Sequence, residues 1–410
     1  MRVAIAAWSI RQAGGVEAYV ASVSGVLAAR GHDVSFWYET DAPHDRPRLD
    51  FSASVQATAL DGDASRARDQ LREWQPDILL LNELENPARE AALADAAPAI
   101  LVAHNYHGIC VSGTKTWQRP HVQPCTRTFG PGCLLAYFPR QCGGRSPVTM
   151  LSLYALASKR LAVARSCAAV VTLSDHMRSE FVRQGIAADR VVTVAYGSSN
   201  ARAGAPAAKT ARPSVRLVAV SRLERVKGVH VAIDAAADLV DRLDRPVTLT
   251  VVGDGREKDR LAQHAADRCR RAARLTVEFT GWLAPDARDL VFTDADLLLV
   301  PSIWAEPFGL VGVEAGRFGL PAVAFDLGGV RQWLEDGING RVAPADPPMA
   351  ENLARAAADC LIDEARYAVM RMGAHRLASR YTIETHVDGL LTLFSQVLGS
   401  DPTVSACASA

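Results

Sequence analysis

Residues 297–315 read LLLVPSIWAEPFGLVGVEA, and this stretch shows the clearest change of structural period in the sequence. Its first four residues are continuously apolar and are bounded by Pro301, as expected for a short strand buried on both faces. After a loop, a helix is expected to begin near Phe308. Because a buried strand followed by a loop and a helix is the repeating unit of a parallel sheet, the stretch predicts an α/β fold.

The same alternation extends from this stretch to both ends of the chain. Strands are predicted at residues 3–8, 34–38, 78–81, 100–103, 169–173, 191–195, 216–220, 249–252, 277–279, 297–300, 322–325 and 340–342. Residues 197–213, rich in Gly, Ala and Pro and without periodicity, predict a linker. A chain of 410 residues also exceeds the size at which one hydrophobic core stops growing. We therefore expect two doubly wound domains, at residues 1–205 and 206–380.

The composition is that of a soluble globular protein, with 49% hydrophobic and 22% charged residues. No segment approaches the roughly 18 consecutive apolar residues of a membrane-spanning helix. The first ten residues share an apolar run with signal peptides, but we interpret them as the first buried strand. Eight cysteines without a secretion signal favour a reducing, cytoplasmic location over a disulfide framework.

The formal net charge is zero, which gives no support to nucleic-acid binding. Charge is nevertheless uneven, because residues 96–174 contain no Asp or Glu but eight Lys or Arg residues. A concentration of one sign of charge is typical of a surface that meets an anion. Solvated arginines in an arginine-rich chain are the alternative explanation.

The first candidate site is Gly14-Gly15, which follows the first strand and opens a helix expected to reach Arg30. Glycines at a helix N-terminus leave backbone N–H groups and the positive end of the helix dipole accessible to a phosphate. The pair is not the G-x-G-x-x-G fingerprint of nicotinamide dinucleotide sites. A simple tight turn is the alternative interpretation.

The second candidate is the segment 221–228, with Arg222 and Lys227 at the end of the strand that opens the second domain. A guanidinium and an ammonium group at this spacing can converge on a diphosphate. A solvated basic loop is the alternative, and the scarcity of lysine in this chain argues against it.

The third candidate is the pair Glu306 and Glu314. Glu306 is expected in the loop after the strand, and Glu314 inside an otherwise apolar helix, where an unpaired carboxylate would be costly. Ribose hydroxyls would supply the hydrogen-bond donors that Glu314 needs. A structural carboxylate that caps a neighbouring backbone is the alternative.

Taken in this order, the motifs resemble those of the retaining GT-B glycosyltransferases of family 4. The resemblance rests on Gly14-Gly15, Arg222, Lys227, residues 251–255 (VVGDG), residues 279–281 (FTG), and Glu306 and Glu314 with the Pro-Phe-Gly between them. It spans nearly the whole chain and is strongest over residues 215–345. It implies a GT-B fold, in which two Rossmann-like domains face a cleft and a C-terminal helix, residues 381–400, returns to the first domain.

The resemblance also implies a role for each matching residue. The C-terminal domain would hold a nucleoside-diphosphate sugar as the donor, and the N-terminal domain would hold the acceptor. Arg222 and Lys227 would bind the diphosphate, and Glu306 would face the donor sugar. The other implied donor-binding residues are Gly14, Gly15, Gly253, Phe308, Gly309, Leu310 and, at the ribose, Glu314.

On the acceptor side, residues 104–110 are similar to a His-Asn-Tyr element of some family members, in which the His lies near the reacting sugar. His104 fits this element and His107 is an additional histidine, so a loop imidazole with a structural role is the alternative for each. The acid-free interval adds Arg119, Arg140 and Arg145 as candidate ligands of an anionic acceptor. Such an acceptor would be a small molecule or linked to a lipid, and the lipid would imply association with a membrane surface.

A metal is not expected at the donor site, because in this fold cationic side chains take the place of a metal ion. A structural zinc is a separate, less favoured alternative to free thiols, because no spacing among the candidate cysteines is C-x2–4-C. Those cysteines are Cys110, Cys125, Cys133 and Cys142.

These observations predict a glycosyltransferase that moves a sugar from a nucleoside diphosphate to an acceptor with retention, without a cofactor and without an enzymic nucleophile. The predicted catalytic residues are Glu306, Arg222, Lys227 and His104. An epimerase or phosphorylase of the same fold, or a nucleotide-sugar sensor without catalytic activity, are the alternatives. The motifs do not identify the base, the sugar, the acceptor or the oligomeric state.

Overall fold

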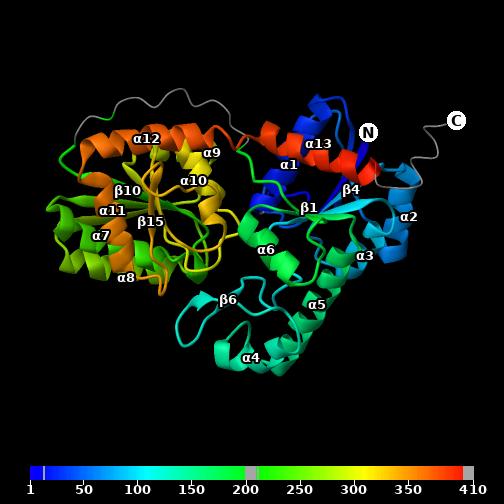
Figure 1. Ribbon diagram of the computed structural model, residues 1–410, viewed down its shortest axis with the longest axis horizontal. Helices are drawn as coiled ribbons and strands as arrows, with labels where there is room; N and C mark the ends of the chain where they lie inside the picture. The colour runs from blue at the N-terminus through cyan, green and yellow to red at the C-terminus, as the bar shows by residue number, and fades with distance from the viewer. Residues whose placement is uncertain (13, 199–208, 210–211, 400–410) are drawn as a thin grey trace. The chain divides into compact units, whose positions relative to one another are not determined.

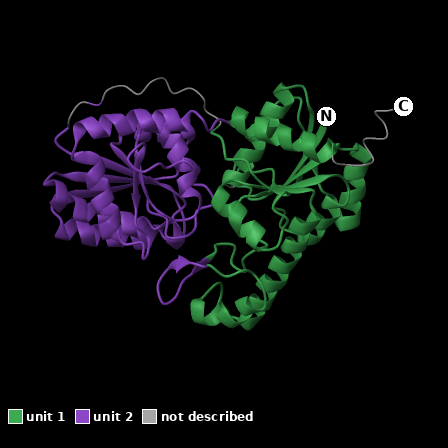
Figure 2. Ribbon diagram, viewed as in Figure 1, with its two compact units in different colours: residues 1–115, 126–199, 383–410 green, residues 116–125, 200–382 purple. Residues whose placement is uncertain are grey.

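The computed structural model describes residues 1–12, 14–198, 209 and 212–399, which we call the described residues. The chain divides into two compact units (Figure 2). Unit 1 comprises residues 1–115, 126–199 and 383–410, and unit 2 comprises residues 116–125 and 200–382. Each unit is built around one parallel sheet flanked by helices (Figure 1).

The sheet of unit 1 has seven parallel strands in the order β3-β2-β1-β4-β5-β8-β9. These are β1 (Arg2–Ser9), β2 (Asp33–Thr40), β3 (Gln56–Ala59), β4 (Ile78–Asn82), β5 (Ala99–Ala103), β8 (Ala169–Thr172) and β9 (Val191–Thr193). The helices are α1 (Gly15–Ala29), α2 (Ala64–Trp74), α3 (Pro87–Ala94), α4 (Gly132–Arg140), α5 (Pro147–Ser166), α6 (Asp175–Arg183) and α13 (Ile383–Gly399). The strand order reverses direction at β1 and β4, as in doubly wound sheets.

The sheet of unit 2 has six parallel strands in the order β12-β11-β10-β13-β14-β15. They are β10 (Val215–Val220), β11 (Val247–Val252), β12 (Leu275–Gly281), β13 (Leu297–Val300), β14 (Ala322–Phe325) and β15 (Gly340–Ala343). The α-helices are α7 (Val229–Leu243), α8 (Lys258–Arg271), α9 (Pro285–Asp294), α10 (Leu310–Gly316), α11 (Ala350–Leu361) and α12 (Glu364–Ala378), with two short 3-10 helices, η1 (Arg225–Lys227) and η2 (Gly329–Gln332). Residues 116–125 add an antiparallel pair, β6 (Thr116–Trp117) and β7 (Gln123–Pro124).

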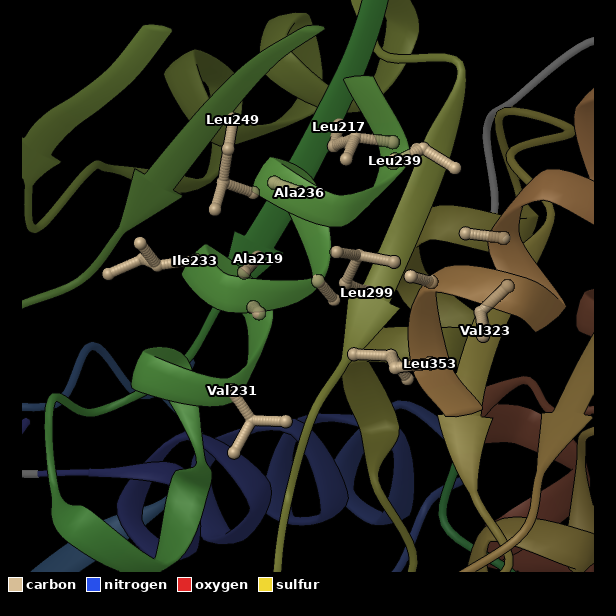
Figure 3. Close-up of a cluster of buried hydrophobic side chains, with 14 of the residues drawn as sticks. Leu217, Ala219, Val231, Ile233, Ala236, Leu239, Leu249, Leu299, Val323 and Leu353 are labelled. Carbon is tan, nitrogen blue, oxygen red and sulfur yellow. The ribbon is translucent and has the colours of Figure 1, made fainter. Parts of the chain in front are cut away.

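The core of unit 2 forms where α7 and α11 cover one face of the sheet (Figure 3). Leu217, Leu249 and Leu299 come from three neighbouring strands and join Ile233 of α7 and Leu353 of α11 in one buried cluster. The apolar residues of α7 recur at helical spacing, which directs one face of the helix into this cluster. The strand ends are thereby held rigidly, and the loops that follow them start from fixed positions.

The predicted α/β class is confirmed, and all twelve predicted strands are present. The sequence analysis missed the two-residue strands β6 and β7 and the longer β3, whose sequence QATA has no apolar run. This strand pairs only with β2 at the edge of the sheet and is partly exposed, so burial does not require apolar residues there.

The C-terminal region forms three helices, α11, α12 and α13, and α13 coincides with the helix expected at residues 381–400. The Asp363 side chain accepts a hydrogen bond from Arg366 N and thereby caps the start of α12. In unit 1, the α13 residue His386 lies with Nε2 2.9 Å from Tyr19 Oη and with Nδ1 2.8 Å from Ala195 O. These contacts anchor α13 in unit 1.

Most of the predicted linker, and the polar tail at 400–410, lie outside the described residues. Within those residues, no helix is both long enough and apolar enough to cross a membrane.

Candidate functional site

The carboxyl ends of the unit 2 strands meet at one edge of the sheet, where several predicted site residues lie. Glycines allow the loops at this edge to touch. A Cβ on Gly253 would lie 1.9 Å from Ser221 O, and one on Gly228 would lie 1.9 Å from Pro301 O. Both glycines have positive φ angles, +136° and +68°, which other residues rarely adopt. Backbone packing therefore holds the loops after β10, β11 and β13 together.

At this edge Lys227 and Glu306 form a buried ion pair. Lys227 Nζ lies 2.7 Å from Glu306 Oε1, and the two side chains are 17% and 7% exposed. Ser302 Oγ donates a hydrogen bond to the same carboxylate oxygen, and Lys227 Nζ lies 4.8 Å from the ring centroid of Trp304. The structure thus joins a residue predicted for the diphosphate to one predicted for the sugar.

The surroundings of Glu306 keep its carboxylate ionised. Burial alone would raise its pKa, but the charge of Lys227 and the hydrogen bonds from Lys227, Ser302 and Trp304 outweigh burial and hold the pKa below its ordinary value. An ionised carboxylate only accepts hydrogen bonds, so it can orient a ligand that presents hydroxyl groups.

The loop that carries Glu306 packs against the loop after β14. Gly329 N donates a hydrogen bond to Glu306 O, and Trp333 Nε1 donates one to Phe308 O, each over 2.6 Å. Gly309, in the left-handed conformation at the start of α10, would place a Cβ 3.3 Å from Trp333 Nε1. These contacts fix the backbone of residues 306–310.

Arg222 stands apart from this pair. Its side chain is 71% exposed, and its ion-pair partner among the described residues is Glu224, with Arg222 Nη1 3.5 Å from Glu224 Oε1. The structure therefore pairs Arg222 and Lys227 with different carboxylates and does not by itself bring the two cations together.

Glu314 has a partner within the protein. Arg288 Nη1, from α9, lies 3.0 Å from Glu314 Oε1, and both side chains are about one-fifth exposed. Burial raises the pKa of Glu314 above its ordinary value, and the charge of Arg288 offsets this only in part. The partner of Glu314 in the structure is therefore a guanidinium and not a neighbouring backbone group.

In unit 1, Gly14-Gly15 precedes α1 as predicted. Neither glycine has a positive φ angle. A Cβ on Gly14 would make an ordinary contact of 3.5 Å with Glu17, and a Cβ on Gly15 would meet nothing within 4 Å. Neither the backbone conformation nor the packing of the described residues requires glycine at these two positions.

His104 lies at the carboxyl end of β5, beside the end of β4. Its Nε2 is 3.0 Å from Asn82 Oδ1, and its ring centroid is 4.9 Å from that of Tyr19. Burial lowers the pKa of His104 to about 4. The imidazole is therefore neutral near pH 7, so it offers hydrogen bonds but no charge.

His107 and His104 belong to one group of side chains, which we call the β4–β5 polar cluster and define as Asn82, Glu83, His104, Asn105 and His107. His107 Nδ1 lies 3.3 Å from Glu83 Oε2, and Asn105 Nδ2 donates to the same oxygen over 2.7 Å. Burial would raise the pKa of Glu83, but its interactions with the two histidines and Arg160 hold it below the ordinary value. The cluster is an ionised carboxylate surrounded by donors.

Two family models match the chain. Residues 208–376 match the model described as Glycosyl transferases group 1, and residues 13–198 match the model described as Glycosyltransferase Family 4. The chain belongs to this family of glycosyltransferases. The two matches confirm the resemblance drawn from the motifs.

Curated relatives of this glycosyltransferase match over part of their length. It is 31% identical over 180 residues to the D-inositol 3-phosphate glycosyltransferase of Corynebacterium urealyticum. The matched region covers 43% of this chain and 41% of the relative. It is 29% identical over 246 residues to the alpha-D-kanosaminyltransferase of Streptomyces kanamyceticus. Here the matched region covers 57% of this chain and 61% of the relative. The chain thus spans about half the length of these relatives.

Solved structures show the same fold over nearly the whole chain. HepE of Anabaena, solved in complex with UDP, is 20% identical with a TM-score of 0.68, covering 97% of this chain and 100% of HepE. The sucrose-phosphate synthase of Thermosynechococcus elongatus is 17% identical with a TM-score of 0.70, covering 98% and 100%. These likenesses confirm the predicted GT-B fold.

Several basic residues of the acid-free interval serve the fold of the glycosyltransferase. Lys115 is buried and forms an ion pair of 2.7 Å with Glu180. Arg160 and Arg165 each donate to a backbone carbonyl oxygen over 3.0 Å. Lys115 is therefore engaged within the protein, whereas Arg160 and Arg165 each make a contact that supports the fold.

The three arginines predicted to bind the acceptor do not fall in one unit. Arg140 ends α4 and Arg145 lies exposed before α5, both in unit 1, whereas Arg119 belongs to the 116–125 segment of unit 2.

Cys110, Cys125, Cys133 and Cys142 form no disulfide among the described residues. Across the described ranges, no group of three or more His, Cys, Asp or Glu side chains is placed to hold a metal ion. The structural zinc considered from the sequence therefore has no ligand set in this part of the chain.

The sequence analysis missed five residues that contact predicted site residues or join them in the β4–β5 polar cluster. They are Asn82, Glu83, Arg288, Ser302 and Trp333. A signal existed for Asn82 and Glu83, because polar residues directly after a buried strand lie where parallel sheets bind ligands. Ser302 lies inside the stretch 297–315. Arg288 carries no such signal, because only the tertiary structure places α9 beside Glu314.

Proposed function

We propose that this glycosyltransferase transfers a sugar from a nucleoside-diphosphate sugar to an acceptor, with retention at the anomeric carbon and without a metal ion. The Lys227–Glu306 pair at the carboxyl edge of the unit 2 sheet is the observation that carries the proposal. It sets a cation suited to a diphosphate beside an ionised carboxylate suited to sugar hydroxyls. Ligands of doubly wound sheets bind at this edge.

Electrostatic stabilisation of the departing diphosphate is the proposed source of most of the rate enhancement. Groups placed in advance where negative charge grows are the most effective contributors to such reactions. An ammonium group has three N–H donors, so Lys227 can hold Glu306 and still donate to a phosphate oxygen. The exposed Arg222 would add a bidentate contact. Lys227 and Arg222 would then neutralise the departing diphosphate without a metal ion.

No side chain is proposed to attack the sugar. Glu306 is engaged by Lys227, Ser302 and Trp304, and a carboxylate bound in this way is a weak nucleophile. Retention would then follow from attack by the acceptor on the face from which the diphosphate leaves. The proton of the acceptor hydroxyl would pass to the departing phosphate oxygen.

The other sequence-based site residues remain part of the proposal. Glu314 is assigned to the ribose hydroxyls, and the open N-terminus of α1 at Gly14-Gly15 is assigned to a phosphate. His104 is assigned to the reacting sugar as a neutral hydrogen-bonding group. Backbone contacts to the donor are assigned to Gly253, Phe308, Gly309 and Leu310.

The acceptor is proposed to be anionic, either a small molecule or lipid-linked. Support comes from Arg140 and Arg145, which lie in a segment without any carboxylate side chain. The name of the relative that glycosylates D-inositol 3-phosphate also indicates a phosphorylated acceptor for that protein. Arg119 and His107 complete the proposed acceptor contacts.

UDP is the first nucleotide to test, because HepE was solved with UDP and with UDP-glucose. The described cysteines form no disulfide, and a reducing, cytoplasmic location is proposed.

The experiment starts with a thermal-shift screen of UDP, GDP, ADP and their sugars, in which a ligand at 100 times its Kd adds about 2.7 kcal/mol. The best nucleotide sugar is then incubated with anionic and neutral acceptors, with and without EDTA, and the product configuration is read by NMR. Acceptor-dependent release of nucleoside diphosphate and retained configuration are expected. Release without acceptor would indicate an epimerase or phosphorylase, and binding without turnover a sensor. Loss of activity that magnesium restores would contradict the metal-independent mechanism.

A further inference from the structure

The exposed large apolar side chains of unit 1 are concentrated in one short region. Among the described residues of this unit, they are Met1 at the chain start and four residues of α4 and the beginning of α5. Those four are Leu135, Phe138, Val148 and Leu151, with exposed fractions of 82%, 43%, 73% and 56%. Single exposed apolar residues are common, whereas four within seventeen positions are a local concentration that calls for an explanation.

These side chains stand on a folded support. In α4, Leu135 and Phe138 are three positions apart and share one helix face. Tyr137 of the same helix is buried, and a Cβ on Gly143 would lie 2.5 Å from its hydroxyl oxygen, so the chain after α4 packs closely on this ring. One face of α4 is therefore exposed through Leu135 and Phe138, while another face is packed through Tyr137.

The beginning of α5 has the same character. Val148 and Leu151 are also three positions apart, and residues 147–156 contain no charged side chain. Burial begins only at Ala157 and continues at Leu161, in the half of α5 near α3. Figure 1 shows α5 running from beside α3 to α4, away from the sheet of unit 1. We call Leu135, Phe138, Val148 and Leu151 the α4–α5 face.

Two exposed cations flank the apolar residues of α5 in the sequence. Arg145 precedes α5 and Lys159 follows its uncharged half, and both side chains are exposed. Neither forms an ion pair with any described residue. Since no Asp or Glu occurs between residues 96 and 174, the sequence supplies no local counter-charge.

We propose that the α4–α5 face docks this protein on an anionic membrane surface. Apolar side chains flanked by Lys and Arg are the combination that binds the boundary between acidic headgroups and acyl chains. A soluble anion would need the cations alone and would leave Leu135 and Phe138 without a purpose. A symmetric dimer through this face would bring Arg145 and Lys159 of two copies together without a carboxylate. The acidic bilayer matches both the apolar and the charged groups.

This inference goes beyond the proposed sugar transfer and does not depend on it, because the readout is the partition of the protein onto lipid. The full-length protein is mixed with vesicles of phosphatidylcholine alone or of equal parts phosphatidylcholine and phosphatidylglycerol, and bound protein is separated by flotation. Binding to the acidic vesicles and little to the neutral ones is expected. Added salt should weaken the binding, because exposed charges are screened.

Two double variants separate the apolar from the charged contribution. Arg145→Gln/Lys159→Gln should lower the partition constant about 30-fold, the effect of two basic residues near an acidic surface. Leu135→Ser/Phe138→Ser should lower it roughly tenfold or more through lost apolar burial. The same apolar variant should leave the KM of a soluble anionic acceptor unchanged, which distinguishes lipid docking from acceptor binding.

Matched controls stand on unit 2. Leu290→Ser/Ile362→Ser removes two apolar side chains that are 72% and 68% exposed, and Arg271→Gln/Arg376→Gln removes two exposed cations. Both controls should bind acidic vesicles within twofold of the wild type. Thermal unfolding confirms that every variant is folded.

The proposal is overturned by equal binding to neutral and acidic vesicles, or by wild-type binding of both α4–α5 variants. It is also overturned if the wild type is a dimer in solution that Leu135→Ser/Phe138→Ser converts to a monomer, since the face would then belong to a second copy of the chain.

Discussion

The carboxyl edges of the two sheets use glycine for different reasons. In unit 2, Gly228 and Gly253 have positive φ angles and no space for a Cβ, so the packing of the protein itself requires them. In unit 1, Gly15 has neither a positive φ angle nor a neighbour within Cβ reach. Gly228 and Gly253 are therefore required by the folded structure itself. At Gly15, neither the backbone conformation nor the packing of the protein requires a glycine.

The charged groups at the two edges differ in the same way. Lys227 and Glu306 are a buried, ionised pair, so each depends on the other for stability. In the β4–β5 polar cluster, His104 is neutral and Glu83 is the charged centre. Changes to the Lys227–Glu306 pair should therefore affect folding and turnover together, and changes at the unit 1 edge should separate them.

The largest effect is expected from Gly253→Ala. Its Cβ would lie 1.9 Å from Ser221 O, so the backbone of one loop must move. The free energy of unfolding should fall by at least ~4 kcal/mol, as for other substitutions that force strain on a packed site. Urea denaturation measures this loss, with Gly15→Ala as the control that keeps wild-type stability. A Gly253→Ala protein as stable as wild type would show that packing does not hold this edge.

Lys227→Ala should affect both turnover and stability. Turnover should fall roughly 10²-fold to 10³-fold, as for the loss of one electrostatic donor to the leaving group. Stability should fall by about 3 kcal/mol, because Glu306 would remain buried without its cation. Steady-state kinetics and urea denaturation measure the two losses.

The double variant Lys227→Ala/Glu306→Gln removes the unpaired charge. It should recover much of the lost stability but none of the turnover. If stability does not recover, the destabilisation has another source than the buried carboxylate.

Arg222→Ala sharpens the same comparison, because it should reduce turnover alone. Its side chain is 71% exposed, so unfolding should change by no more than about 0.5 kcal/mol. Turnover should again fall roughly 10²-fold to 10³-fold. Arg271→Ala, at another exposed position, is the matched control for kinetics and should retain full turnover. Activity of Arg222→Ala within a few-fold of wild type would remove it from the site.

The buried histidines of unit 1 should make stability depend on pH. Burial lowers the pKa of His104 and of His386 from 6.5 to about 4. Between these values the unfolded chain binds more protons than the folded one, so the unfolding free energy falls as the pH falls from 6.5 to 4. The contribution is up to about 3 kcal/mol for each histidine. Urea denaturation at several pH values should show a smaller slope in His386→Gln than in the wild type, and equal slopes would contradict the assignment.

The smallest effect is expected from Gly15→Ala. Its Cβ enters open space, so stability should stay at the wild-type value. If a phosphate approaches the N-terminus of α1, the added methyl group should lower kcat/KM for the donor by about tenfold through misplacement. If kcat/KM of Gly15→Ala equals the wild-type value, Gly15 does not contact the donor.

The strands were predictable because local sequence already reports burial in a parallel sheet. β13 reads LLLV and β4 reads ILLLN, continuous apolar runs that only a strand covered on both faces needs. The edge strand β3 escaped prediction because its exposed side requires no such run. The same local logic identified Glu306, whose loop begins where β13 ends.

The partners of the site residues were not predictable in this way. Lys227 and Glu306 are 79 positions apart, and His104 and Asn82 are 22 apart. Each pair meets because strand order places two loops side by side, which no local pattern encodes. Arg288 had no signal at all, although it supplies the cation that Glu314 requires.

The sequence by itself therefore determined which chemical groups this protein offers: a framework of buried strands, with cations and carboxylates in the loops that follow them. Only the tertiary structure decided their state, with Glu306 ionised, the pKa of Glu314 raised and His104 neutral. The physical reason is range. Hydrophobic periodicity is set by neighbours a few positions away in sequence, whereas a pKa is set by burial and by charges a few ångströms away in space.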